Sequence, residues 1–270
     1  MVSIIIINYN TCQLTLNCIS SIYRYVSGKF EIIVVGNASS EPCIQRIERE
    51  FPDVRLIANA SNVGFAKGNN LGVSAAFGDH VLLLNSDTIL SSDVITVLAG
   101  YLDRDPAVAA ATCRLEYPDG RVQHNCQRFP AAKYLLFEFL RLQKIFPKDV
   151  GGRFLLGSFF DYRAVVYPDW IWGTCMMIRR KAIEELPARK LAEDFFMYGE
   201  DMQWCLDFRK IGYKVVFVPE AKVVHLMGMS GAKKNELMKK NEKLILRKYY
   251  TGIHRLSIKF LSKCLQWSQR

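Results

Sequence analysis

The strongest signal for the fold is one stretch of sequence, His80-Val81-Leu82-Leu83-Leu84-Asn85-Ser86-Asp87. Its first part is an apolar run typical of a buried strand, and the run ends abruptly in an Asn-Ser-Asp cluster. In open α/β sheets, ligands bind in the crevice outside the carboxyl ends of the strands. Asp87 is therefore expected where a phosphate-bound metal ion would lie, which makes the chain a candidate enzyme.

The first hundred residues alternate short apolar runs with segments of helical period, the pattern of an α/β fold with a mainly parallel sheet flanked by helices. Strands are expected at residues 2–7, 31–35, 54–58 and 80–84. Polar clusters follow each of them, at residues 8–10, 36–40, 59–64 and 85–87. Because the carboxyl ends of parallel strands meet at one edge of a sheet, we expect a single ligand to reach all four clusters.

The second half of the chain has a less regular pattern. Residues 117–168 carry turn signals and an aromatic-rich segment, and we expect a variable, partly helical insertion there. A helix is expected over residues 202–211, closed by Gly212, and a strand over residues 213–218. His225 follows a further apolar pair, Val223-Val224.

The positive charge of the chain is concentrated at its end. Residues 233–270 hold eleven Lys or Arg and two Glu, so they carry +9 of the net charge of +10. No nucleic-acid-binding motif accompanies this charge, and no nucleic-acid partner is expected. Apolar residues recur there at helical spacing, at Leu246, Tyr249, Ile253, Leu256 and Phe260. The sequence therefore predicts a basic amphipathic helical tail, which either packs on the catalytic domain or lies on an anionic membrane.

Other features of the sequence bear on the compartment. The chain opens with Met1-Val2-Ser3-Ile4, without the charged leader of a secretory signal, and no apolar run approaches the roughly 18 residues that span a bilayer. Its eight cysteines show no C-x-x-C pair and no zinc-like spacing. We expect a cytoplasmic protein that is peripheral on the inner face of the cell membrane if its tail binds lipid.

Two acidic sites carry the expected chemistry, and each has a structural alternative. Asp87 could cap a helix that begins near Ser91 or Ser92. Glu200-Asp201 could be first-turn charge that interacts favourably with a helix dipole. Together, however, the two sites supply a metal-binding carboxylate and a separate carboxylate base, which group transfer from an activated phosphate ester needs.

Five segments of the chain occur in an order typical of a known family. They are Ser3-Ile4-Ile5-Ile6-Ile7-Asn8-Tyr9-Asn10, Asn37-Ala38-Ser39-Ser40, Asn62-Val63-Gly64-Phe65-Ala66, Asn85-Ser86-Asp87, and Phe196-Met197-Tyr198-Gly199-Glu200-Asp201 with His225. Over roughly residues 2–230 the chain resembles family 2 glycosyltransferases of the GT-A fold, nearest to a rhamnosyltransferase-like subgroup. The resemblance implies inverting transfer of a sugar from a nucleoside diphosphate sugar to an acceptor hydroxyl, in one displacement at the anomeric carbon.

The resemblance also implies roles for individual residues. Asn85-Ser86-Asp87 is similar to the D-x-D-type site at which Mg²⁺ or Mn²⁺ bridges the diphosphate, with Asp87 as the ligand, and oxygen ligands suit such hard ions. His225 either completes this site or is a buried structural histidine. Asp201 matches the catalytic base of the family, and the adjacent Glu200 is the alternative for that role.

The donor-binding candidates that the resemblance implies are Tyr9, Asn37, Asn62, Gly64, Phe65, Asn85 and Ser86. Tyr9 resembles the aromatic residue that packs on the nucleobase, with core packing as the alternative. The chain departs from the family at Gly36, where relatives usually have an Asp that contacts the base or ribose. It also has Leu191-Ala192-Glu193 where relatives often have Phe-Asp-Glu.

We therefore expect a GT-A domain over residues 1–230, with a donor half of about 1–116 and an acceptor half of about 117–230, and the basic tail over 231–270. The expected partners are a nucleoside diphosphate sugar, a glycan or lipid-linked glycan acceptor, and an anionic membrane. A catalytically silent sugar-nucleotide or glycan binding protein is the alternative that Gly36 motivates. A nucleotidyltransferase, which releases pyrophosphate, is the nearest enzymatic alternative.

Overall fold

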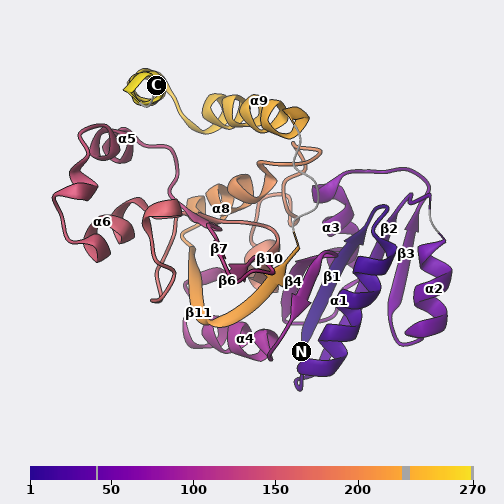
Figure 1. The fold of residues 1–270 in the computed structure, drawn as a ribbon. Helices are drawn as coiled ribbons and strands as arrows, with labels where there is room; N and C mark the ends of the chain where they lie inside the picture. The colour runs from indigo at the N-terminus through magenta and orange to yellow at the C-terminus, as the bar shows by residue number, and fades with distance from the viewer. Residues whose placement is uncertain (41, 227–231, 269–270) are drawn as a thin grey trace.

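The computed structural model describes residues 1–40, 42–226 and 232–268 of the 270-residue chain. A nine-stranded sheet lies at its centre, in the order β3-β2-β1-β4-β10-β6-β11-β5, with β7 paired to β6 (Figure 1). Four strands of the donor half are parallel neighbours: β1 (Val2–Asn8), β2 (Phe30–Asn37), β3 (Arg55–Asn59) and β4 (His80–Asn85). They match the four expected strands to within two residues, and their carboxyl ends share one edge of the sheet.

The apolar runs of β1, β2 and β4 are buried on both sides of the sheet, whereas the edge strand β3 is partly exposed. Ile4 and Ile6 point to one face and Ile5 to the other, and all three are inaccessible to solvent. Three helices cover the first face: α1 (Cys12–Tyr25), α2 (Cys43–Glu50) and α4 (Val94–Arg104). Three more cover the second: α3 (Phe65–Ala75), α7 (Arg180–Glu184) and α8 (Glu200–Lys210).

The remaining strands make the sheet mixed. They are β5 (Thr88–Leu90), β6 (Val108–Glu116), β10 (Cys175–Arg179) and β11 (Lys214–His225). β10 runs antiparallel between β4 and β6, whereas β11 is parallel to β6 and antiparallel to β5. β11 continues beyond the expected end at residue 218 because a register shift between Val218 and Lys222 lets pairing with β6 resume. The strand therefore ends at His225, opposite Thr88.

The expected insertion is partly helical. It contains β7 (Val122–Gln123), β8 (Cys126–Gln127), α5 (Ala132–Phe139), α6 (Lys148–Leu155) and two 3₁₀ turns, Leu142–Lys144 and Gly157–Phe159. β8 pairs with β9 (Trp170–Ile171), which precedes β10. Phe137 packs against Phe146 and Phe154, so an aromatic cluster of its own holds the insertion together.

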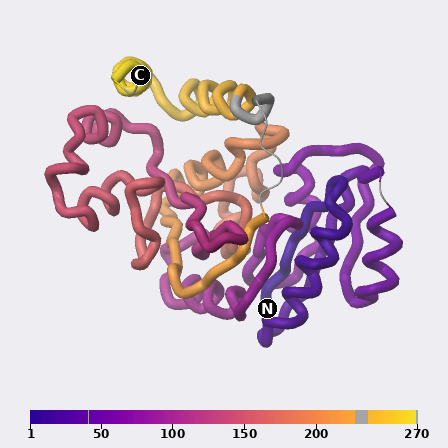
Figure 2. Tube along the Cα trace, viewed as in Figure 1, coloured from indigo at the N-terminus to yellow at the C-terminus, as the bar shows by residue number. Residues whose placement is uncertain are grey.

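The tail forms two helices, α9 (Ala232–Tyr249) and α10 (Gly252–Ser268), while the expected boundary at residues 230–231 lies outside the described residues. α9 packs over the segment before α8, where Asn241 Nδ2 donates to the carbonyl oxygens of Met197 and Tyr198 at 2.9 and 2.6 Å. α10 turns away and contacts α5, as the tube in Figure 2 shows. None of the described helices is long and apolar enough to cross a membrane.

Candidate active site

A cavity of about 790 Å³ opens at the carboxyl edge of the sheet. Of the residues singled out in the sequence, the cavity is lined by Phe65, Asn85, Asp87, Glu200, Asp201 and His225. Asp87 follows β4, whereas Glu200 and Asp201 open α8 on the far side of the insertion. The fold thus brings both acidic sites to one cavity.

Asp87 does not cap a helix. The N-cap of α4 is Asp93, whose Oδ1 accepts a hydrogen bond from the backbone N–H of Thr96 at 3.0 Å, and Asp87 is followed by β5 instead. The carboxylate of Asp87 lies 3.3 Å from Nε2 of His225, and both side chains are largely buried. The backbone ties the two segments together as well, because the N–H of Leu226 donates to the carbonyl oxygen of Asp87 at 2.9 Å.

Gln123, which sequence reasoning did not single out, fixes the orientation of His225. Its Nε2 donates to the carbonyl oxygen of His225 at 2.8 Å, which leaves its Oε1 as an acceptor 2.7 Å from Nδ1 of the ring. The ring proton is therefore held on Nδ1. In the neutral ring, the lone pair of Nε2 then faces the carboxylate of Asp87, and this arrangement is attractive only when a proton or a metal ion occupies Nε2.

The Asp87 and His225 pair fits a divalent cation bound together with a diphosphate. The described residues contain no group of three or more His, Cys, Asp or Glu side chains that could hold a metal ion. Mg²⁺ sites commonly use one or two protein carboxylates and leave the other positions to substrate phosphates and water. An imidazole nitrogen beside a carboxylate oxygen is a donor set that Mn²⁺ also accepts.

Asp201 is held rigidly at the start of α8. Its Oδ1 accepts from the N–H of Met202 at 2.8 Å, and its Oδ2 accepts from the N–H of Gly173 at 3.4 Å. Glu200 is more buried, with 5% of its surface exposed, and within the described part of the chain its Oε2 has no hydrogen-bond partner.

The two carboxyl groups differ in acidity. Burial, and then the neighbouring charge of Asp201, raises the pKa of Glu200 to about 8. Burial also raises the pKa of Asp201, but hydrogen bonds from the Met202 and Gly173 N–H groups oppose the shift, and its pKa is about 6. The backbone hydrogen bonds favour the ionised form of Asp201, whereas the Oε2 atom of Glu200 has no such donor among the described residues, so the proton is held preferentially by Glu200.

The backbone at the start of α3 lies close to the backbone of the segment that precedes α8. The N–H of Phe65, at the start of α3, donates to the carbonyl oxygen of Phe196 at 2.8 Å. A Cβ on Gly64 would lie 2.5 Å from that oxygen, and Gly64 has a φ of +84°, so only glycine fits. This glycine is therefore a structural requirement for placing α3 against the start of α8.

The other predicted donor-binding residues do not line the cavity. Asn37 is buried and holds the loop before α3, since its Nδ2 donates to Asn62 Oδ1 at 2.7 Å and its Oδ1 accepts from the N–H of Val63 at 3.0 Å. Ser86 Oγ lies 3.0 Å from Thr11 Oγ1. Tyr9 is 46% exposed, so the core-packing alternative does not hold for it.

Gly36 lies at the end of β2, where its register partner on β1 is Asn8. A Cβ at this position would lie 2.7 Å from Cδ1 of Ile44 on α2. The space that a longer side chain would need is therefore occupied by the flexible end of an isoleucine.

Several cavity residues were not found from the sequence. They are Trp172, Gly173 and Thr174 in the connection between β9 and β10, Arg128 after β8, and Met238, Glu242 and Ile245 on α9. Three of these residues lie in a break between β9 and β10. The signal that could have revealed it is Gly173, whose backbone N–H lies against Asp201.

Comparison with known proteins agrees with the fold. The Glycosyl transferase family 2 model matches residues 3–186, about two thirds of the chain, and the chain belongs to this family. The matched residues include Asp87 and end before Glu200 and Asp201.

Among curated relatives, the chain is 27% identical over 212 residues to the low-salt glycan biosynthesis hexosyltransferase Agl10 of Haloferax volcanii, covering 77% of this chain and 61% of that protein. It is 25% identical over 218 residues to the N-acetylglucosaminyl-diphospho-decaprenol L-rhamnosyltransferase of Mycobacterium tuberculosis, covering 72% and 66%. An uncharacterised Sinorhizobium fredii protein is 28% identical over 75% of this chain and 22% of its own length. The chain thus spans 22–66% of the length of these relatives.

Solved structures share the fold. A mannosyltransferase from Pyrobaculum calidifontis, in complex with GDP-Man and Mn²⁺, has a TM-score of 0.65 at 16% identity, covering 99% of this chain and 71% of that one. GalNAc-T7 with UDP, GalNAc and Mn²⁺ has a TM-score of 0.66 at 14% identity, covering 99% and 55%. The GT-A fold expected from the sequence is confirmed.

Proposed function

We propose that this family 2 glycosyltransferase moves a sugar from a nucleoside diphosphate sugar to a hydroxyl group of a glycan, with inversion at the anomeric carbon. The observation that carries the proposal is the shared cavity of Asp87 and Asp201. The carboxylate of Asp87 lies at a strand end, where a diphosphate can bind. The carboxylate of Asp201 can accept the proton of an attacking hydroxyl.

Asp201 is the general base of the proposed reaction, in preference to Glu200. A base must be ionised to accept the proton of the attacking hydroxyl, and the hydrogen bonds from Met202 and Gly173 favour the ionised form of Asp201. Its two backbone hydrogen bonds also fix the direction of its carboxylate. Glu200 stays protonated beside it, which keeps a second negative charge away from the base.

The donor side of the proposed site consists of Asp87 and His225, which would hold Mg²⁺ or Mn²⁺. When bound, such an ion offsets the negative charge that develops on the departing diphosphate. Gln123 keeps Nε2 of His225 turned toward Asp87. The Mn²⁺ in both structural neighbours, with GDP-Man in one and UDP in the other, supports this assignment.

The acceptor is proposed to be linked to a lipid, and the protein to be peripheral on an anionic membrane. α10 supports this because it has two apolar faces. Ile258 is buried on the side that packs on the protein, whereas Ile253, Leu256, Phe260 and Trp267 are 63–83% exposed. These four residues follow at intervals of three, four and seven, so they lie on one side of the helix.

Basic residues flank this exposed apolar stripe, at Arg255, Lys259 and Lys263. Apolar residues beside cations are the composition of helices that lie in a membrane interface, where each cation near an anionic surface contributes about 1 kcal/mol. α9 has a different role, since its Ile245 is buried in the hydrophobic core of the catalytic domain. Only α10 is therefore proposed to contact lipid.

A screen of nucleotide sugars against a pool of glycan acceptors, read by mass spectrometry, tests the proposal. The expected result is release of a nucleoside diphosphate that needs acceptor, divalent metal and Asp201, and Asp87→Ala should weaken metal-dependent donor binding. Release of pyrophosphate would indicate a nucleotidyltransferase. Donor binding without turnover under all conditions would indicate a silent binding protein.

A further inference from the structure

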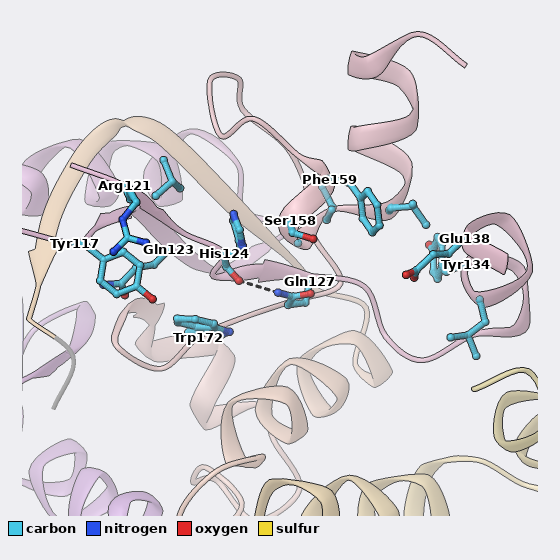
Figure 3. A pocket seen from close by; sticks show the side chains of 15 residues that line it. Tyr117, Arg121, Gln123, His124, Gln127, Tyr134, Glu138, Ser158, Phe159 and Trp172 are labelled. Carbon is cyan, nitrogen blue, oxygen red and sulfur yellow. Dashed lines mark hydrogen bonds between the residues drawn. The ribbon is translucent and has the colours of Figure 1, made fainter. Parts of the chain in front are cut away.

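A second cavity, of about 920 Å³, lies beside the active site and is formed mostly by the insertion (Figure 3). Its wall includes the rings of Tyr117, Tyr134 and Phe159 and the polar side chains of His124, Gln127 and Ser158. The volume falls in the range of pockets that hold drug-sized ligands, and it exceeds what one sugar ring fills.

The chemistry of this cavity suits a neutral ligand with many hydroxyl groups. Arg121 in the cavity wall forms an ion pair with Asp119, in which Nε lies 2.7 Å from Oδ2. Burial lowers the pKa of His124, so its ring is neutral at pH 7 and both donates and accepts hydrogen bonds. Glu138 adds a carboxylate to the wall. A phosphate would find no matching charge there, whereas aromatic faces and neutral polar groups match the C–H faces and hydroxyls of sugars.

Trp172 connects the two cavities, because it lines both. The backbone N–H of Trp172 donates to the carbonyl oxygen of Asn125 at 3.1 Å. The backbone N–H of the next residue, Gly173, donates to Oδ2 of Asp201. The backbone of Trp172 is thus fixed one residue away from the contact that holds the proposed base. A sugar ring stacked on Trp172 would lie at the passage between the cavities.

Strained backbone forms another part of the wall. Leu156 is fully buried with a φ of +60° and a ψ of −153°, a conformation that is almost restricted to glycine. Gly157 follows with a φ of +56°, and together they present Ser158 and Phe159 to the cavity. Residues held in such conformations concentrate at binding sites, where the surrounding structure maintains them.

α5 separates this cavity from the surface near α10. Tyr134, Leu135 and Glu138 line the cavity, whereas Leu136 and Phe139 on the other side of the helix are exposed. α5 also contacts α10. α5 therefore lines the second cavity and also contacts the helix that carries the stripe proposed to contact lipid.

We propose that the second cavity binds the acceptor as an oligosaccharide of more than one sugar ring, with its reacting ring against Trp172 and a hydroxyl toward Asp201. This inference rests on the proposed function, because it assigns the acceptor class of the same reaction. It adds that sugar rings remote from the reacting hydroxyl contribute binding energy through the insertion.

Ser158→Trp tests the inference, since Ser158 is exposed on the cavity wall and an indole there would fill the cavity without removing an internal contact. The matched control is Ser20→Trp, at an exposed serine on α1. Full-length protein is applied to an array of immobilised monosaccharides and oligosaccharides, in the absence of donor. We expect oligosaccharides to be retained over monosaccharides, with an apparent affinity lowered about ten-fold or more in Ser158→Trp and unchanged in Ser20→Trp. Thermal unfolding verifies that both variants fold.

Binding of no oligosaccharide, or equal binding by Ser158→Trp and wild type, contradicts the inference. Donor hydrolysis in the absence of acceptor separates this failure from failure of the proposed function. If wild-type protein hydrolyses a nucleotide sugar in an Asp201-dependent way but the array result is negative, the cavity assignment alone is wrong. If no nucleotide sugar is hydrolysed or transferred while oligosaccharides bind, the catalytic proposal is wrong and a glycan-binding role stands.

Discussion

Nε2 of His225 lies 3.3 Å from Oδ1 of Asp87, in a pair assembled from the ends of β11 and β4. Gln123 holds the ring proton on the opposite nitrogen, so the contact is attractive only when a cation occupies Nε2. Gln123 also lines the second cavity, which places it between the proposed metal site and the proposed acceptor site.

Gln123→Met should weaken metal binding in the proposed site. The substitution keeps the size of the side chain but releases His225, and loss of a group that orients a metal ligand typically costs about 10- to 100-fold in metal affinity or activity. The measurement is the concentration of Mn²⁺ that gives half-maximal donor turnover. Gln13→Met, on the exposed surface of α1, is the control, and an identical Mn²⁺ dependence in both variants would count against the role of Gln123.

Asp201→Asn should keep donor binding but lower turnover by about 10²- to 10⁴-fold, because the amide cannot accept the acceptor proton. Donor affinity is measured by calorimetry and turnover by release of nucleoside diphosphate. Normal turnover in this variant would remove Asp201 from the role of base. A matching loss in Glu200→Gln, with Asp201→Asn unaffected, would transfer the role to Glu200.

The rate of transfer should rise with pH through about 6, as Asp201 loses its proton. The pKa of this group is raised by burial, so the rise is expected well above the usual range of an aspartic acid. A profile of kcat/KM from pH 4 to pH 8 measures it for the free enzyme. A flat profile across pH 5–7 would contradict ionisation of Asp201 as the step that activates the site.

Glu200→Gln should stabilise the protein selectively at high pH. Folding raises the pKa of Glu200 from 4.5 to about 8, so the stability that its protonated form provides is complete below pH 4.5 and is lost as pH rises through 8. The amide avoids burying a charge, and the gain at pH 9 is on the order of 4 kcal/mol relative to pH 4.5. Thermal unfolding at both pH values, with the exposed Glu48→Gln as control, checks this, and an equal shift at both would refute it.

Phe260→Ser should reduce binding to vesicles of phosphatidylglycerol and phosphatidylcholine. Burial of a phenylalanine side chain contributes about 1.5–3 kcal/mol, so co-sedimentation should weaken roughly ten-fold or more. Phe77→Ser removes a phenylalanine of similar exposure from another surface and should have no effect. Equal sedimentation of the two variants would exclude α10 as the lipid contact, and high salt should weaken wild-type binding because charge contributes.

Local patterns in the sequence were sufficient to predict the parallel strands β1 to β4. Apolar runs such as residues 80–84 are buried on both faces of a parallel sheet, so they could be assigned as strands without knowledge of distant residues. The polar clusters after these strands are then expected to meet at one edge, and Asp87 lies there, on the wall of the cavity. These conclusions depend on local pattern and on a general rule for parallel sheets.

The contact between His225 and Asp87, in contrast, depends on tertiary packing. His225 arrives there because β11 shifts register against β6 and pairs with β5, and register between distant strands leaves no local trace in a sequence. Trp172 and α9 reach the cavity for the same reason, through packing of segments far apart in the chain. The choice between Glu200 and Asp201 also required the fold, because burial and backbone hydrogen bonds, rather than residue type, set which carboxyl group is ionised.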